Sequence, residues 1–212
     1  MRAYHLNFSM AVLDRNGVSV AQKPTAASNL TITGALATGG VATFDVARHV
    51  GIYSSGADTG RTFTVTGTDR NGKALSEAIT GPGAAATVNG SSNFLTITQI
   101  AVDAATAGNI EVGTTDEADT AFVVTDAYRD TITYGIDLSA SAGLTSEFKY
   151  TVSDPFDSSF SQETANYRAD LGASNGDYQG VSDGPISGCR LEITNWTSAD
   201  DIVNFHIITS DK

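Results

Sequence analysis

The run Gly180-Val181-Ser182-Asp183-Gly184 has the Gly-x-Ser-x-Gly spacing of a nucleophile elbow. In such an elbow, a sharp turn between a strand and a helix exposes the serine hydroxyl for attack on an acyl carbon. Here the polar residues Gly176–Gln179 precede the motif and Pro185 follows it, which predicts a polar loop. We therefore expect that Ser182 is not a nucleophile.

Histidine and cysteine side chains are the other groups that commonly transfer protons, bind metals or attack substrates. His5, His49 and His206 lie in separate segments, so a shared site would need the fold to bring them together. His206 alternates with apolar neighbours, which predicts that it faces solvent or a neighbouring subunit. Cys189 is the single cysteine, so no internal disulfide forms, and we expect its side chain to be a small buried group.

Carboxylates occur in two clusters that offer oxygen ligands of the kind calcium prefers. The first contains Asp116, Glu117 and Asp119, and the second contains Asp154 and Asp157. Neither cluster has the Asp-x-Asp-x-Asp-Gly spacing of a dedicated calcium loop, so both are expected to be solvated acidic loops. Because no catalytic set or cofactor motif is found, the sequence predicts a protein that is not an enzyme and uses no cofactor or metal.

Aromatic side chains on loops are a further group of candidates, because exposed tyrosine and tryptophan can stack on sugars or anchor an interface. Tyr167 and Tyr178 lie in the polar segment 158–184, which is long for a loop and is expected to contact a partner or to contain further structure. Trp196 follows a predicted strand, and its position fits packing at the core edge and an exposed anchor equally well.

The elements that would position these residues are short strands, since apolar and polar residues alternate between glycines. The pattern predicts strands at Leu30–Thr33, Thr62–Thr66, Phe94–Ile97 and Ile110–Val112. A turn of helix is compatible with residues 46–50 and 161–171, although neither segment has a sustained helical stripe.

Two Asn-Gly turns predict hairpins, because these residues tolerate the positive φ that tight turns require. The run Asp14–Gly17 predicts a hairpin over residues 10–20, and the run Asp69–Gly72 is expected to join a strand around Phe63 to residues 75–80. Many short strands without helical crossovers favour antiparallel sheets over a parallel one.

The predicted fold is therefore all-β, with two antiparallel β-sandwich domains of jelly-roll or immunoglobulin-like type and an N-terminal arm. The expected boundaries are an arm or hairpin at 1–24, a first sandwich at 25–113, an acidic linker at 114–121 and a second sandwich at 122–212. The arm is expected to pack on either sandwich or on a neighbouring subunit.

Charge narrows the choice of partners. The 212 residues include 12 Lys and Arg against 24 Asp and Glu, which gives a net charge of −12. This balance argues against nucleic acid, whose binding needs basic side chains that displace counterions from phosphates. No apolar run has the length of a membrane helix or a secretion signal, so we expect synthesis in the cytoplasm and no membrane partner.

Several segments together resemble structural proteins of tailed bacteriophages and prophages. They are Phe63–Glu77, Ile79–Gly83, Phe94–Ile100, Ile110–Gly113, Phe148–Pro155, Pro185–Thr194 and Val203–Thr209, and the resemblance covers most of residues 25–212. It implies a component of the virion, of the capsid decoration or cement type, which stabilises the head lattice by bridging major capsid subunits. A homotrimer at local threefold positions on the capsid surface is one arrangement that the resemblance implies.

Residues 1–24 are the expected contact element, because arms and sheet edges hold subunits by strand addition through main-chain hydrogen bonds. The candidate contact residues are His5, Leu6, Phe8, Tyr167, Tyr178 and Trp196. Deletion of residues 1–20 is expected to leave a folded protein that no longer binds particles.

Two other functions are considered beside capsid decoration. The first is a tail, adaptor or head-fibre component of the same virion, although the long repeats or trimerising coiled segment expected of a fibre are not found. The second is a carbohydrate-binding module or small glycosidase, which would use loop aromatics such as Tyr178 and Trp196 with a pair of carboxylates.

Overall fold

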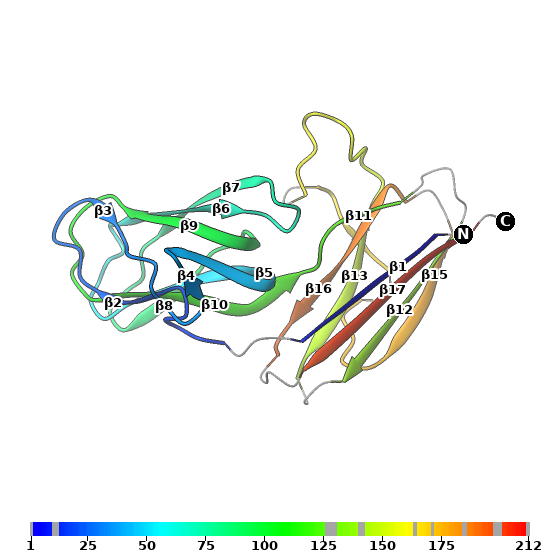
Figure 1. The fold of residues 1–212 in the computed structure, drawn as a ribbon, viewed down its shortest axis with the longest axis horizontal. Helices are drawn as coiled ribbons and strands as arrows, with labels where there is room; N and C mark the ends of the chain where they lie inside the picture. The colour runs from blue at the N-terminus through cyan, green and yellow to red at the C-terminus, as the bar shows by residue number, and fades with distance from the viewer. Residues whose placement is uncertain are drawn as a thin grey trace. The chain divides into compact units, whose positions relative to one another are not determined.

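The residues described by the computed structural model are 2–9, 13–125, 131–139, 143–162, 165–170, 172–183, 186–196 and 201–210. Their regular structure consists of β-strands in antiparallel sheets, and no helix occurs among them (Figure 1). The predicted all-β class is confirmed.

The chain divides into two compact units. Unit 1 contains Met1–Val12 and Asp119–Lys212, and unit 2 contains Leu13–Ala118. This division differs from the sequence-based one, because the expected arm at 1–24 is split between the two units. Both ends of the chain therefore belong to the same unit.

Unit 2 has a main sheet of strand order β10-β5-β9-β6-β7. These strands are β5 (Val41–Ser54), β6 (Thr62–Thr68), β7 (Ala74–Thr80), β9 (Phe94–Val102) and β10 (Ile110–Asp119). Four shorter strands pair with them: β2 (Ser19–Gln22) with β10, β3 (Ser28–Asn29) with β9, and both β4 (Ala37–Thr38) and β8 (Ala86–Asn89) with β5. Alternate side chains such as Phe63 and Val65 point into one apolar core, as strand geometry requires.

The predicted hairpin at Asp69–Gly72 is confirmed, since β6 and β7 pair from Thr62 and Thr80 toward the turn. The Asp69 carboxylate accepts the backbone N–H groups of Asn71 at 2.8 Å and Lys73 at 2.9 Å. Gly72 has a φ of 79°, a conformation that glycine adopts without the steric cost of a side chain.

The predicted hairpin over residues 10–20 is described only in part. Residues 10–12 lie outside the described part of the chain, and Asp14–Gly17 does form a turn, with 3.2 Å between the Gly17 nitrogen and the Asp14 oxygen. However, the chain after the turn pairs with β10, and the Val18 N–H donates to the Val112 carbonyl at 3.0 Å. Turn chemistry sets the local bend, whereas burial of Val18 in the core of unit 2 sets the pairing partner.

The expected boundary at 114–121 contains the division between the units, which falls between Ala118 and Asp119, but the segment is not a loop, because β10 continues through it to Asp119. Two of its acidic residues have basic partners, and one of them, Asp119, is buried. Glu117 Oε2 lies 2.6 Å from His49 Nδ1, and the Asp119 carboxylate, with its side chain 2% exposed, lies 2.9 Å from Arg190 Nη1. A buried acid with a basic partner is compatible with a strand, so acidic composition alone did not identify a loop.

Some of the remaining secondary-structure predictions are confirmed and others are wrong. The strands expected at Thr62–Thr66, Phe94–Ile97 and Ile110–Val112 are present within β6, β9 and β10. Residues 46–50 lie in β5 and form no turn of helix, and Leu30–Thr33 is not a strand. Leu30 and Ile32 are nevertheless buried, because an extended chain alternates its side chains even without a ladder of hydrogen bonds.

Unit 1 contains two sheets. The first has strand order β1-β17-β12-β15, built from β1 (Arg2–Ser9), β12 (Thr131–Ser139), β15 (Tyr178–Asp183) and β17 (Ile202–Ser210). The second has strand order β14-β13-β16, with β11 also paired to β16, built from β11 (Val123–Val124), β13 (Thr145–Thr151), β14 (Arg168–Ala169) and β16 (Gly188–Thr194). In the first sheet, β1 pairs with β17 along its full length, so strands from the two ends of the chain lie side by side (Figure 1).

An aromatic core joins the two sheets of unit 1. The rings of Tyr134 in β12 and Phe148 in β13 stack with their centroids 3.9 Å apart, and Phe205 in β17 lies 6.0 Å from Phe148. Because these side chains come from different sheets and are all buried, the sheets face each other in a sandwich-like arrangement.

Candidate functional site

The outward side of the first sheet of unit 1 presents side chains that are mostly polar. We call it the outer face and define it by His5, Asn7, Thr133, Gly135, Asp137, Gln179, Val181, Asn204, His206 and Ile208. Their strand neighbours point the other way, as shown by Phe205 and Ile207, which have 0% and 1% of their surface exposed. The period of two in a strand therefore separates the outer face from the core.

Two histidines from opposite ends of the chain meet on the outer face. His5 in β1 is directly opposite His206 in β17, and their rings stack with centroids 4.2 Å apart and an angle of 8°. Asp137 in β12 places Oδ2 3.6 Å from His206 Nε2. Next to the ring pair, the Asn7 side-chain amide donates a hydrogen bond to the Asn204 side-chain oxygen.

A shallow depression of about 290 Å³ lies beside this histidine pair. Its floor is Gly135, above which the space is open, and its borders include Asp137, Gln179, His206 and Ile208. The depression offers a carboxylate, an amide and an imidazole at an exposed surface. This arrangement suits hydrogen bonding to polar groups of another macromolecule, and it lacks the enclosure typical of a small-molecule site.

β1 forms one edge of this sheet. No strand within the described ranges pairs with its second edge, and an edge of this kind can pair with a strand of another chain. The side chains of Tyr4 and Leu6 point inward and are half-buried. Residues 2–9 of the expected arm or hairpin thus form an edge strand that packs on unit 1, which is one of the placements expected for it.

The candidate contact residues in the N-terminal segment have different positions. His5 is exposed on the outer face, whereas Leu6 is half-buried toward the core. Phe8 pairs with Val203 through its backbone, but its side chain lies outside the described residues. Deletion of residues 1–20 would remove β1 from unit 1 and the buried Val18 from unit 2, so a folded product is no longer expected.

Trp196 is fully buried, with 0% of its surface exposed. The alternative of core packing is therefore correct, and the alternative of an exposed anchor is wrong. A tryptophan offers a large apolar area, so its burial contributes to the core of unit 1. It is not available to stack on a sugar or a capsid.

The side chains of Tyr167 and Tyr178 both contact other residues of unit 1. The Arg190 guanidinium lies over the Tyr167 ring, 4.1 Å from its centroid, and the Tyr167 hydroxyl donates to the Gln162 carbonyl at 3.1 Å. The Tyr178 hydroxyl accepts the Phe148 N–H at 3.1 Å, and burial raises its pKa to about 12. The segment 158–184 therefore contains structure that the pattern did not show, including β14 and β15.

The Gly-x-Ser-x-Gly motif and Cys189 were the remaining catalytic candidates, and both lie in β-strands. Gly180–Asp183 lies in β15 rather than in a polar loop, Gly184 is outside the described residues, and the next described element is the strand β16 rather than a helix. This geometry differs from a nucleophile elbow. Cys189 is buried as expected, and burial raises its thiol pKa to about 12.

The acidic clusters do not assemble a metal centre in the described part of the chain, where no group of three or more His, Cys, Asp or Glu side chains has suitable geometry. Asp154 and Asp157 instead accept backbone N–H groups two residues further on, at 2.9 Å from Phe156 and 2.7 Å from Ser159. These are Asx turns, which organise a loop locally.

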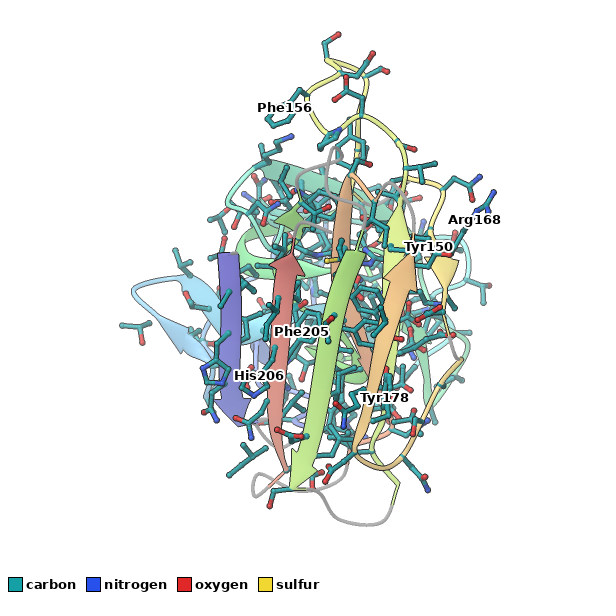
Figure 2. All side chains as sticks on the ribbon, turned by 90° about the vertical axis from the view of Figure 1, so that its right-hand side faces the viewer. Tyr150, Phe156, Arg168, Tyr178, Phe205 and His206 are labelled. Atoms are coloured by element: carbon teal, nitrogen blue, oxygen red, sulfur yellow. The ribbon has the colours of Figure 1, made fainter. Side chains whose placement is uncertain are left out.

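Phe156 is an exposed aromatic residue that is not among the contact residues expected from the sequence. It is 83% exposed, and Figure 2 shows it on a loop that extends beyond the ends of the strands. An apolar residue in a polar run is usually read as buried, so the pattern gave no reason to single it out. The available signal was its position between Asp154 and Asp157, both of which favour turns.

Comparison with known proteins adds no family. No protein-family model matches the sequence, and no curated protein matches it. Among the described residues there is also no helix long and apolar enough to cross a membrane.

Proposed function

We propose that the protein is a non-enzymatic structural component of a tailed-phage virion, a capsid decoration protein on the outer surface of the head. In this proposal it binds the major capsid protein, stabilises the lattice by bridging neighbouring subunits, and associates with copies of itself, for example as a trimer. The finer fold belongs to the proposal too: two sandwiches of jelly-roll or immunoglobulin-like type, the second completed by the N-terminal strand.

The observation that carries the proposal is the edge strand β1, which displays the outer face beside a free edge. Strand addition to such an edge uses main-chain hydrogen bonds, which tolerate variation in the side chains of the partner. The pair of exposed His5 and half-buried His206, together with the polar border of the depression, can then select the register of the contact. The sequence segments that resemble phage structural proteins support the same function.

The proposed mechanism uses many modest contacts repeated by symmetry. Each contact on a capsid is one of a large number of equivalent ones, and linked contacts raise the effective concentration of the next. Because the chain carries a net charge of −12, attachment to basic capsid patches would weaken as salt screens these charges over about 8 Å at physiological ionic strength.

The experiment that tests the proposal is the copy number of this chain relative to the major capsid protein in purified particles, measured by quantitative mass spectrometry. A ratio near one to one is expected for a decoration protein. A ratio of a few per cent would contradict decoration and assign the chain to the tail or a fibre, and absence from particles would overturn the virion function.

A further inference from the structure

We propose that the loop formed by residues 152–161 is a preformed binding knob whose Phe156 side chain inserts into an apolar pocket, bordered by basic side chains, on a partner protein. The partner's identity rests on the proposed function, in which it is a capsid protein. The inference names a second contact site of unit 1, separate in sequence from β1 and the outer face.

The exposure of Phe156 has no explanation within unit 1. The side chain is 83% exposed, and Val152 at the start of the same loop is 61% exposed. Exposed single apolar residues are common, but here two lie on one loop that projects from the strands (Figure 2). Aromatic residues, phenylalanine included, are enriched at the cores of protein interfaces relative to the rest of the surface.

The loop is organised before any partner binds. Two consecutive Asx turns shape it, and the Asp157 carboxylate accepts both the N–H and the hydroxyl of Ser159, at 2.7 and 2.6 Å. Backbone bonds from Asp157 to the Asp154 carbonyl at 3.3 Å and from Phe160 to the Asp157 carbonyl at 3.0 Å close the turns. A preorganised loop loses less conformational entropy on binding than a flexible one.

Both ends of the loop are attached to the body of unit 1. At its start, the Ser187 hydroxyl donates to the carbonyls of Thr151 at 2.9 Å and Ser153 at 2.5 Å. At its end, the Phe160 ring packs against Phe122, with 5.4 Å between the centroids. One phenylalanine therefore holds the loop while Phe156 faces outward, so the two aromatic residues have different roles.

Charge selects the kind of partner. Asp154 and Asp157 flank Phe156 and are both exposed, and the hydrogen bonds from Ser159 lower the pKa of Asp157. The knob is therefore apolar at its centre and negative at its sides near neutral pH. Such a surface fits a pocket with a basic border, whereas an anionic membrane surface or a second copy of this acidic chain would repel it.

The test uses particles purified from a phage in which the gene for this chain is deleted, and full-length protein added back. Binding is measured by co-sedimentation over a range of protein concentrations and salt concentrations. The variants are F156A, the charge-neutral D154N/D157N pair, whose asparagines can still form Asx turns, and V20A. Val20 is 44% exposed on β2 of unit 2, so V20A removes exposed apolar surface that belongs neither to the knob nor to the outer face and is the matched control.

We expect F156A to weaken particle binding by at least about tenfold, as for a central interface residue, with an unchanged thermal midpoint. D154N/D157N should bind several-fold more weakly at low salt and show less salt dependence, and V20A should bind as the wild type does. Equal binding by F156A and wild type would overturn the knob while leaving the proposed function intact.

Three other results would also overturn the inference. Wild-type protein that fails to bind particles would remove the proposed function and the partner named here together. Binding of wild type to anionic lipid vesicles that is lost in F156A would assign the knob to a membrane. A self-association that F156A abolishes in sedimentation velocity would assign it to a second copy.

Discussion

Cys189 shows how a single side chain is controlled by its surroundings. It lies in β16 with no exposed surface, and burial raises its thiol pKa to about 12. Desolvation disfavours the charged form of any buried group. The thiolate, which is the reactive form, is therefore almost absent in the folded protein.

We expect Cys189 in the native protein to react with a thiol reagent at pH 8 at least about a thousandfold more slowly than an ordinary exposed thiol, given a usual cysteine pKa of about 8.5. The measurement is the rate of colour release from a disulfide reagent, in buffer and in denaturant. Reaction should become rapid on unfolding. The variant S158C, which places a thiol at an exposed position of the knob, is the control and should react quickly while folded; a fast native reaction of wild type would contradict the burial of Cys189.

At the scale of elements, the paired sheets of unit 1 hold two tyrosines in protonated form. Burial, first, and the hydrogen bond to Asp170, second, raise the pKa of Tyr134 well above its ordinary value. Its hydroxyl donates to Asp170 Oδ2 at 2.6 Å. Burial likewise raises the pKa of Tyr178 to about 12. Ionisation of either ring would place a negative charge in the aromatic region between the sheets.

The pH dependence of stability follows from the sign of these shifts. An unfolded tyrosine loses its proton near pH 10, while Tyr178 in the folded protein keeps it until about pH 12. Unfolding therefore releases protons in this range, and the free energy of unfolding should fall as pH rises from about 10 to about 12. Below pH 10 these tyrosines should cause no pH dependence.

Urea unfolding midpoints at pH 8, 10 and 11 measure this loss. The variant Y178F removes one of the two hydroxyls, so its midpoint should be lower at pH 8, because the Phe148 N–H loses its acceptor, but should fall less steeply above pH 10. Identical slopes for Y178F and wild type would show that Tyr178 does not contribute to the alkaline loss.

At the scale of the whole molecule, the division into units changes which fragment should fold alone. Unit 2 is one continuous segment, Leu13–Ala118, whereas unit 1 combines both ends of the chain. Val18 is fully buried in the core of unit 2, and β2 pairs with β10. A fragment cut at the sequence-based boundaries, 25–113, lacks both of these contributions.

We expect fragment 13–118 to fold by itself with a cooperative thermal transition, followed by circular dichroism. Fragment 25–113 should be less stable, by at least about 1.5–3 kcal/mol for the missing buried valine alone, with a further loss from the unpaired β10. If the two fragments melt at the same temperature, residues 13–24 do not belong to the cooperative unit and the sequence-based boundary is the better one.

Much of the fold could be predicted from local pattern. Alternation identified β6, β9 and β10, and the chemistry of Asp69 and Gly72 identified the hairpin between β6 and β7, because both signals depend on residues close together in the chain. The same chemistry at Asp14–Gly17 correctly predicts a turn but does not predict that the following strand, β2, pairs with β10. A turn does not specify which strand its flanks will join. For the candidate site, His206 was placed correctly on an exposed face, but its contact with His5 joins residues far apart in sequence.

The all-β class, the acidic charge and the exposed and buried sides of several strands can be predicted from the amino-acid sequence, because they follow from composition and from the period of two along a strand. The docking of β1 beside β17, the burial of Trp196 and the exposure of Phe156 result from long-range packing. Those outcomes depend on which distant segments compete for the same apolar surface. Local pattern records the preference of each residue for burial, but the packing of the whole chain decides which preferences are satisfied.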